Sequence, residues 1–350
     1  MSFRLPLSQS PTAARPTGPV PTAGALVDTF GRIHDNLRIS VTDRCNLRCT
    51  YCMPEDVTFL PKDALLTFEE IAHFVRVAVD LGVTKVRLTG GEPLLRRDLP
   101  RLVEMLVAIP GLHDLGLTTN GLLLAAQARS LRDAGLRRLN VSLDTLDADR
   151  FRELSRRDGL DQVLNGLAVA RDAGFERIKV NAVAIRGLTE LDVVPLAHYC
   201  RDSGFDLRFI EYMPIGADPW ERDKVLPASE ILDELAREFG DLTTTVDHDP
   251  HAPALEFAYA DGRGTVGIIA SITRPFCMQC NRLRLTADGK VRNCLFALDE
   301  VDVRHLLRPR PDDATLGKTI RAVVWDKWEG HEINTARFIK PTRTMHAIGG

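Results

Sequence analysis

The chain has 350 residues, a net charge of -3 and 44% hydrophobic residues. A chain of this length buries roughly three quarters of its unfolded surface, enough for two domains or one large one. The slight acidic excess argues against a general nucleic-acid-binding protein, which is expected to be basic. No apolar run of about 18 residues predicts a membrane span, and the N-terminus lacks the apolar segment of a secretory signal.

Residues 1–27 are rich in proline, threonine, alanine and serine, and they predict a disordered leader. Arg4 and Arg15, with no acidic residue before Asp28, are compatible with a transit peptide. The prolines oppose the amphipathic helix that such peptides form, so this alternative is disfavoured.

From Asp28 onwards, short apolar segments alternate with helical stretches. The apolar segments are bounded by turn residues, as buried parallel strands are. A capping box from Thr67 to Glu70 marks the start of one helix, and Gly135 and Gly174 follow the ends of two others. The six expected strands are 37–41, 85–89, 114–118, 138–143, 178–184 and 207–210.

Six strand–helix units predict an α/β fold with a parallel sheet curled into part of a barrel. The alternation alone does not separate this incomplete (βα)6 barrel from a flat doubly wound sheet, and the cysteine chemistry below favours the barrel. The alternation ends after Pro214, and a further helix is expected at 228–239. We therefore expect a leader at 1–27, a partial barrel at 28–225 and a C-terminal domain at 226–350.

A β-hairpin is expected from Arg282 to Cys294. Asp288-Gly289 is typical of a two-residue hairpin turn, which would place Leu283 opposite Cys294. Cys280 lies three residues before Leu283, roughly 10 Å away at the rise of a strand. A small loop before the hairpin would therefore bring Cys280 close to Cys294.

Seven cysteines form two groups of three and one single residue. This arrangement is a poor disulfide framework. Closely spaced cysteines in an enzyme-sized chain more often bind a metal, which also indicates a reducing compartment. We expect the single residue, Cys200, to be a buried thiol in an apolar helix. The groups are Cys45, Cys49 and Cys52, and Cys277, Cys280 and Cys294.

The first group, with the spacing Cys-x3-Cys-x2-Cys, directly follows the first expected strand. Three thiolates on one loop can share an iron–sulfur cubane and leave one of its four irons open for a small molecule. The alternative is structural zinc, which needs four ligands. The nearest histidines, His34 and His73, have no ligand-like spacing, so zinc is disfavoured.

This loop resembles the signature of the radical S-adenosylmethionine (SAM) superfamily. The resemblance implies that the open iron chelates the methionine end of SAM, whose reductive cleavage gives a 5′-deoxyadenosyl radical. Tyr51 stands where the family has an aromatic residue near the adenine. Gly90-Gly91-Glu92-Pro93, one strand later, fits the same family, in which Gly91 would contact the SAM amino group.

The second group again offers three ligands without a clear fourth. His305 is the best spare candidate for a closed zinc site. A second cluster with an open iron is the favoured interpretation. That iron would face the substrate, because SAM already occupies the first cluster.

Together, the two cysteine blocks closely resemble the molybdenum-cofactor biosynthesis protein A family, the GTP 3′,8-cyclases, from about Asp28 to Gly350. The resemblance implies a lyase that uses two 4Fe-4S clusters and SAM to convert GTP into 3′,8-cyclo-7,8-dihydro-GTP, the first step of molybdenum cofactor biosynthesis. A radical at C3′ of the ribose would attack C8 of guanine. Gly349-Gly350 matches the family's tail, which enters the active site, whereas the sequence alone favours a frayed terminus.

Position by position, the resemblance also implies the residues that line the pocket. A triphosphate demands cations, and Arg282 and Arg284 alternate onto one face of their strand, so both guanidinium groups would lie beside the second cluster and take part in catalysis. The expected SAM contacts are Tyr51, Gly91, Ser142 and Met213. The expected GTP contacts are Arg38, Arg87, Thr118, Lys179, Arg282, Leu283 and Arg284.

The same resemblance implies an electron donor, a downstream cyclic pyranopterin monophosphate synthase that takes the product, and a cytoplasmic enzyme without nucleic-acid or membrane partners; it allows a homodimer. Two rivals remain. A peptide-modifying radical SAM enzyme usually carries more C-terminal cysteines than three. A two-cluster electron carrier or redox sensor normally holds each cluster with four protein ligands.

Overall fold

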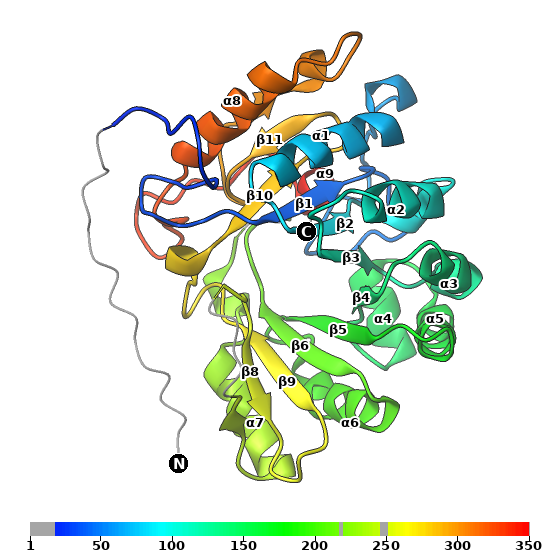
Figure 1. Cartoon of the computed structure of the whole chain (residues 1–350). Coiled ribbons are helices and arrows are strands. Elements are labelled where there is room, and N and C mark those ends of the chain that lie inside the picture. Colours follow the sequence, from blue (N-terminus) through cyan, green and yellow to red (C-terminus); the bar gives the residue numbers. More distant parts are fainter. Residues whose placement is uncertain (1–17, 217–219, 246–250, 350) are drawn as a thin grey trace.

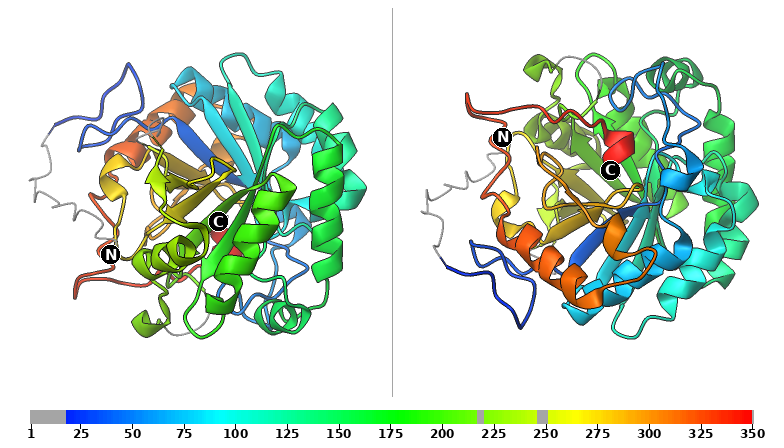
Figure 2. Two further views of the ribbon diagram at one scale, coloured as in Figure 1. Left: turned by 90° about the horizontal axis from the view of Figure 1, so that it is seen from below. Right: turned by 90° about the horizontal axis from the view of Figure 1, so that it is seen from above.

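One 12-stranded sheet runs through the part of the chain that the computed structural model describes, residues 18–216, 220–245 and 251–349. The strand order is β12-β11-β10-β1-β2-β3-β4-β5-β6-β9-β8-β7. The sheet is curled, with helices α1, α2, α3, α5 and α6 along its outer side (Figure 1). Views from below and above show the same curl (Figure 2). Residues 1–17 of the expected leader and Gly350 of the expected tail lie outside the described residues.

Six parallel strands form the centre of the sheet, each hydrogen-bonded to the next in chain order. Every predicted strand boundary is within one residue of the observed one, which confirms the α/β prediction. Alternate side chains such as Leu37, Leu88 and Val141 are fully buried. The strands are β1 (Asn36–Ser40), β2 (Lys85–Thr89), β3 (Asp114–Thr119), β4 (Arg138–Ser142), β5 (Arg177–Ala184) and β6 (Asp206–Glu211).

The helices begin and end close to the predicted signals. Thr67 and Glu70 form the predicted capping box: the Glu70 amide donates to Thr67 Oγ1 at 3.2 Å, and the Thr67 amide donates to Glu70 Oε2 at 2.7 Å. None of the described helices is long and apolar enough to cross a membrane. The α-helices are α1 (Phe68–Asp80), α2 (Leu99–Val107), α3 (Leu124–Asp133), α4 (Ala148–Ser155), α5 (Leu160–Asp172), α6 (Val193–Ser203), α7 (Ala228–Phe239), α8 (Asp313–Trp325) and α9 (Met345–Ile348).

The second half of the chain extends the sheet at both edges rather than forming a separate layer. One edge gains a strand parallel to β6 and two antiparallel ones; the other gains a strand parallel to β1 and a short antiparallel pair. Strands β7 and β12 are the two edges of the sheet among the described residues. They do not pair with each other, so the barrel is open. The added strands are β7 (Thr243–Thr244), β8 (Leu255–Ala258), β9 (Thr265–Ile269), β10 (Arg282–Leu285), β11 (Lys290–Arg292) and β12 (Val301–Asp302).

The predicted hairpin exists, but its predicted register is wrong by one residue. Arg284 pairs with Arg292 and Leu285 with Val291, so Leu283 is not opposite Cys294. A two-residue type I′ turn requires a positive φ at both Asp288 and Gly289, but of the two only Gly289 has one (+80°), as in three-residue hairpins. Leu26, within the expected leader, is buried in the core.

Glu211, the last residue of β6, ties the C-terminal segments to the barrel. Its carboxylate is completely buried and accepts hydrogen bonds from the backbone amides of Ala228, Ile272 and Thr273 at 3.0, 2.8 and 2.8 Å. The Thr273 hydroxyl donates a further bond. This one carboxylate therefore fixes both the start of α7 and the segment that leads to the second cysteine group.

We expect Glu211→Ala to lower the free energy of unfolding by about 3 kcal/mol or more. The substitution leaves the buried amides of Ala228 and Ile272 and the amide of the exposed Thr273 without an acceptor, and each buried amide costs about 1–3 kcal/mol. Urea midpoints of variant and wild type, measured on protein in the same cofactor state, check this. The matched control is Glu230→Ala at an exposed position on α7, where the change should stay within about 0.5 kcal/mol. Similar midpoints for the two variants would contradict the role of Glu211.

Candidate functional site

The first cysteine group lies on the loop after the C-terminal end of β1, and the glycine-rich loop after β2 packs against its base. A Cβ atom on Gly91 would stand 2.3 Å from the Arg44 carbonyl oxygen, so only glycine fits there. The same carbonyl accepts a hydrogen bond from the Glu92 amide at 2.7 Å. Burial raises the pKa of the Glu92 carboxyl to about 7, and the carboxyl accepts bonds from Thr119 and Asn120 on the next loop. Three successive strand ends are thus locked together around the cysteines.

The three cysteines of this group are half-buried, and their thiols lie within electrostatic reach of one another. Burial raises the pKa of Cys52 to about 12, and Cys45 adds to the rise. Burial and then Cys52 raise the pKa of Cys49 well above its usual range. Three such thiolates repel one another unless a cationic centre binds them, so the site fits a metal cluster that takes thiolate ligands.

Tyr51 is fixed beside the cysteine loop by a buried carboxylate. Its hydroxyl donates to Asp144 Oδ2 at 2.6 Å, and Asp144 Oδ1 accepts from the Val183 amide at 2.8 Å. Burial raises the pKa of Asp144 to about 6. Ser142 ends β4, and Met213 lies two residues after β6. The four residues expected to contact SAM therefore all lie at or just beyond the C-terminal ends of barrel strands.

The second cysteine group lies beside strands β10 and β11, which are next to β1 in the sheet. It is at the end of these strands opposite to the end where the first group lies. Cys277 begins the 3-10 helix η5 (Cys277–Gln279), Cys280 leads into β10, and Cys294 follows β11. Burial and then Cys294 raise the pKa of Cys277 to about 11. Burial alone would also raise the pKa of Cys280, but the positive charges of Arg282 and Lys327 outweigh it and lower that pKa well below its usual range.

Neither group of thiols is arranged for a single metal ion. Within the described residues, no three His, Cys, Asp or Glu side chains form a set that could hold one ion. Zinc needs thiolates at about 2.3 Å from a common point. His305, the candidate fourth ligand, is exposed and belongs to no such set.

A row of arginines crosses the inner face between the two groups. Arg38 on β1 pairs in register with Arg284 on β10 and with Arg87 on β2. Burial, and then the charges of Arg284, Arg282 and Arg87, lower the pKa of Arg38 well below its usual range. Buried nitrogen atoms of Arg38, Arg87 and Arg282 have no hydrogen-bond partner among the described residues. Like charges at paired strand positions are destabilising, so this row fits an anionic ligand.

Glycines opposite two arginines make room for their side chains. Gly116 on β3 pairs with Arg87, and a Cβ atom there would stand 2.8 Å from Arg87 Nη1. Gly267 on β9 pairs with Arg208, and its Cβ atom would stand 3.0 Å from Arg208 Cγ. The sequence reasoning missed Arg208 and both glycines, although a glycine inside a strand is itself a signal of close approach.

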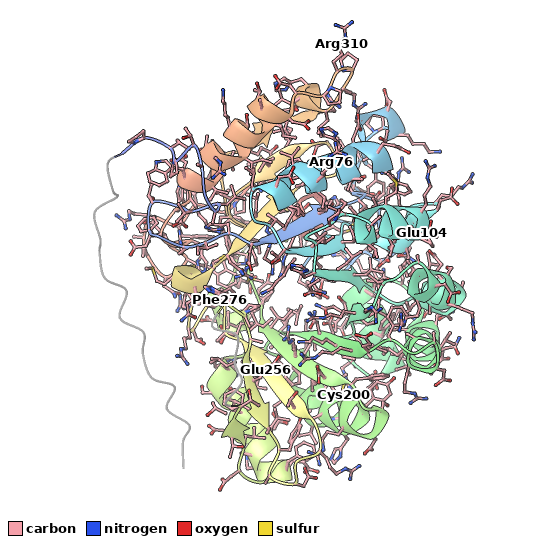
Figure 3. The ribbon with its side chains drawn as sticks, in the orientation of Figure 1. Arg76, Glu104, Cys200, Glu256, Phe276 and Arg310 are labelled. Atoms are coloured by element: carbon pink, nitrogen blue, oxygen red, sulfur yellow. The ribbon has the colours of Figure 1, made fainter. Side chains whose placement is uncertain are left out.

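A second group of cations surrounds Glu256 on β8, which is labelled in Figure 3. The Lys179 ammonium lies 3.4 Å and Arg208 Nη2 lies 2.6 Å from Glu256 Oε1. Lys179 is only 4% exposed. Burial, followed by the charges of Arg208 and Arg177, lowers the pKa of Lys179 to about 7. Thr118, at the end of β3, pairs with Asn140, which in turn pairs with Lys179.

The chain's tail lies against the C-terminal ends of β1 and β2. A Cβ atom on Gly349 would stand 2.9 Å from Thr89 Cγ2 and 3.1 Å from Ser40 Cβ, and its carbonyl accepts a hydrogen bond from Arg284. The His346 amide donates to the Cys52 thiol. The frayed terminus that the sequence alone favours is therefore wrong as far as Gly349.

Two of the predicted residues lie outside this arrangement. Cys200 is buried in α6, on the outer side of the sheet, which confirms the expected buried thiol (Figure 3). The Leu283 side chain is 1% exposed and belongs to the hydrophobic core. A nucleotide would therefore meet only the backbone of Leu283.

The chain is similar to known proteins over nearly its whole length. Residues 39–200 match the Radical SAM superfamily model, and residues 205–333 match the Molybdenum Cofactor Synthesis C model. A GTP 3′,8-cyclase of Rhodopirellula baltica is 51% identical, over 100% of this chain and 98% of its own length. A GTP 3′,8-cyclase of Mycolicibacterium smegmatis is 49% identical, over 97% of this chain and 98% of its own length.

Solved structures share the fold at much lower identity. Streptococcus suis SuiB bound to S-adenosylmethionine superimposes with a TM-score of 0.57 at 17% identity, covering 83% of this chain and 68% of that chain. Native anSMEcpe with bound AdoMet gives a TM-score of 0.56 at 16% identity, covering 85% and 82%. At this identity the likeness supports the fold alone.

We expect Cys49→Ala and Cys277→Ala each to remove about half of the iron and acid-labile sulfide that the reconstituted protein binds, because each substitution breaks one of two four-iron sites. Iron and sulfide per chain after anaerobic reconstitution measure this. Cys200→Ala is the matched control and should keep the full content. Full iron in Cys277→Ala would rule out the second site.

Proposed function

This chain belongs to the GTP 3′,8-cyclase family, and on that premise we propose that it converts GTP into 3′,8-cyclo-7,8-dihydro-GTP. The observation that carries the proposal is the row of buried arginines between two incomplete thiol groups. A triphosphate would supply anionic partners for the buried nitrogen atoms of Arg38 and Arg87 that have no hydrogen-bond partner among the described residues. The arginine fork binds phosphate oxygens in bidentate fashion.

The two cysteine groups divide the cofactor chemistry between them. Cys45, Cys49 and Cys52 would hold a 4Fe-4S cluster that, when bound, supplies the electron for reductive cleavage of SAM. The protein's own contribution at this end is to orient SAM: Asp144 fixes the ring of Tyr51, and the backbone at Gly91 lies against the cysteine loop. Ser142 and Met213 would complete the SAM site.

The inner face of the barrel would hold GTP. Cys277, Cys280 and Cys294 would bind the second cluster, with Arg282 directly beside Cys280. Lys179 and Thr118 face the same interior from β5 and β3. These cations would hold the triphosphate and so position C3′ of the ribose for hydrogen abstraction, and the tail would help to exclude water.

The remaining partners are part of the same proposal. The enzyme needs an electron donor, passes its product to a cyclic pyranopterin monophosphate synthase, and works in the cytoplasm, where thiol-ligated clusters persist in a reducing environment. A homodimer is compatible with it. The proposal also includes the division of the chain into a leader at 1–27, a partial barrel at 28–225 and a C-terminal domain at 226–350.

The experiment that tests the function is an anaerobic assay of the reconstituted chain with SAM and dithionite, in the presence or absence of GTP. We expect 5′-deoxyadenosine and 3′,8-cyclo-7,8-dihydro-GTP to form together only when GTP is present. The Cys49→Ala variant is the control and should form neither. Release of 5′-deoxyadenosine with a peptide substrate but not with GTP would favour the peptide-modifying alternative.

We expect GTP binding at pH 8 to be accompanied by proton uptake at Lys179. In the protein without GTP, the pKa of Lys179 is lowered to about 7, so its side chain is mostly neutral at pH 8. A neighbouring phosphate favours the charged form and raises this pKa, so a proton is taken up on binding. Calorimetry in two buffers of different ionisation enthalpy measures the uptake.

The control for that measurement is Lys179→Arg. Arginine keeps its charge at pH 8, so this variant should bind GTP without the lysine's share of the uptake. Equal proton uptake by wild type and Lys179→Arg would show that Lys179 does not change its charge on binding.

A further inference from the structure

A buried lysine contacts the second cysteine group directly. Lys327 follows α8 and is only 2% exposed. Its ammonium nitrogen lies 3.4 Å from Cys280 Sγ and 2.8 Å from the Arg282 carbonyl oxygen, and it donates a hydrogen bond to each. Both acceptors belong to the short segment that links the second cysteine group to β10.

Such a lysine is expensive to bury unless it faces negative charge. An isolated ammonium loses much hydration free energy in a protein interior, and one neutral carbonyl does not restore it. In the loaded protein, Cys280 Sγ is a metal-bound thiolate, so the contact from Lys327 becomes a charge-assisted hydrogen bond. The position of Lys327 is therefore explained by a negatively charged centre at this group.

Arg32 braces the segment that follows Lys327. Its guanidinium donates to the carbonyl oxygens of Trp328 at 2.6 Å, Glu329 at 2.8 Å and Cys277 at 2.7 Å. Asp28, itself 2% exposed, holds the same guanidinium at 2.5 Å. One side chain thus joins the cysteine loop to residues 328 and 329, which are next to Lys327 in the chain.

The end of this segment contacts another cysteine of the group. Gly330 packs against Cys277, since a Cβ atom added to Gly330 would stand 3.6 Å from Cys277 Sγ. The His331 amide donates to the Cys277 thiol. Residues 327–331 therefore place hydrogen-bond donors on two of the three sulfurs. Of these donors, only the Lys327 side chain carries a full charge.

We propose that Lys327 is a positioning residue of the second cluster. Its ammonium group holds the Cys280 thiolate by an N–H···S hydrogen bond, and its positive charge stabilises the reduced cluster. The proposal rests on the second cluster of the proposed function. One-electron reduction adds one negative charge to the site, and a fixed positive charge nearby favours that state. Hydrogen bonds to cluster sulfurs and local charge are known to set such potentials.

The test is a redox titration of the full-length chain carrying Cys45→Ala, Cys49→Ala and Cys52→Ala, so that only the second cluster contributes. Dithionite supplies the electron, and electron paramagnetic resonance follows the reduced cluster. We expect Lys327→Met to shift the midpoint potential to more negative values. We also expect it to remove the coupling of an exchangeable proton that the lysine N–H gives in D₂O exchange.

Two further variants make the result decisive. Lys327→Arg keeps a charged donor and should recover most of the potential. Lys318→Met, at an exposed position on α8, is the matched control and should leave potential and spectrum unchanged. If Lys327→Met loses the iron of this group while Lys327→Arg retains it, the charge is required to hold the cluster and the assignment stands.

The assignment is overturned if potential and spectrum are unchanged in Lys327→Met, or if Lys327→Met and Lys327→Arg lose the cluster equally. None of these measurements uses GTP or turnover. The predicted shift together with a wild-type chain that does not turn over GTP would refute the proposed function and leave the role of Lys327 intact. Turnover of GTP by the wild-type chain without the shift in the titrated variants would do the reverse.

Discussion

The site depends on like charges that the fold forces together. Arg284, Arg38 and Arg87 occupy paired positions on three neighbouring strands, where their mutual repulsion is destabilising. The register cannot slip to relieve it, because a shift of one residue would exchange the inner arginines with buried residues such as Leu37 and Leu283. Hydrophobic burial on the outer face therefore offsets the charge repulsion on the inner face, and an anion bound there would relieve that repulsion. A nucleotide triphosphate is an anion of suitable charge.

The tail links that inner face to the first cysteine group. The Gly349 carbonyl accepts a bond from Arg284, and three residues earlier the His346 amide donates to Cys52. A carbonyl is a weak substitute for a phosphate, so Arg284 keeps its capacity to bind an anion while it is held in place. The backbone of the tail therefore contacts the arginine row and the first cysteine group at once.

Regular periodicity made most of the fold and much of the site predictable. The central strands, the Thr67 capping box and the inward alternation of Arg282 and Arg284 all follow from local residue patterns. The hairpin register did not, because Asp288 does not adopt the positive φ that a two-residue Asp-Gly turn requires. Lys327 escaped prediction for a different reason: it meets Cys280 from 47 residues away, and no local pattern encodes that contact.

The parallel pairing of β10 with β1 explains how two cysteine groups can act on one substrate. The first group follows the C-terminal end of β1, whereas Cys277 and Cys280 precede the N-terminal end of β10. Because the two strands run in the same direction, the groups lie at opposite ends of one strand pair. Four or five residues span roughly 15 Å at the rise of a strand. The arginine row lies midway, so an anion bound there would reach toward both metal sites.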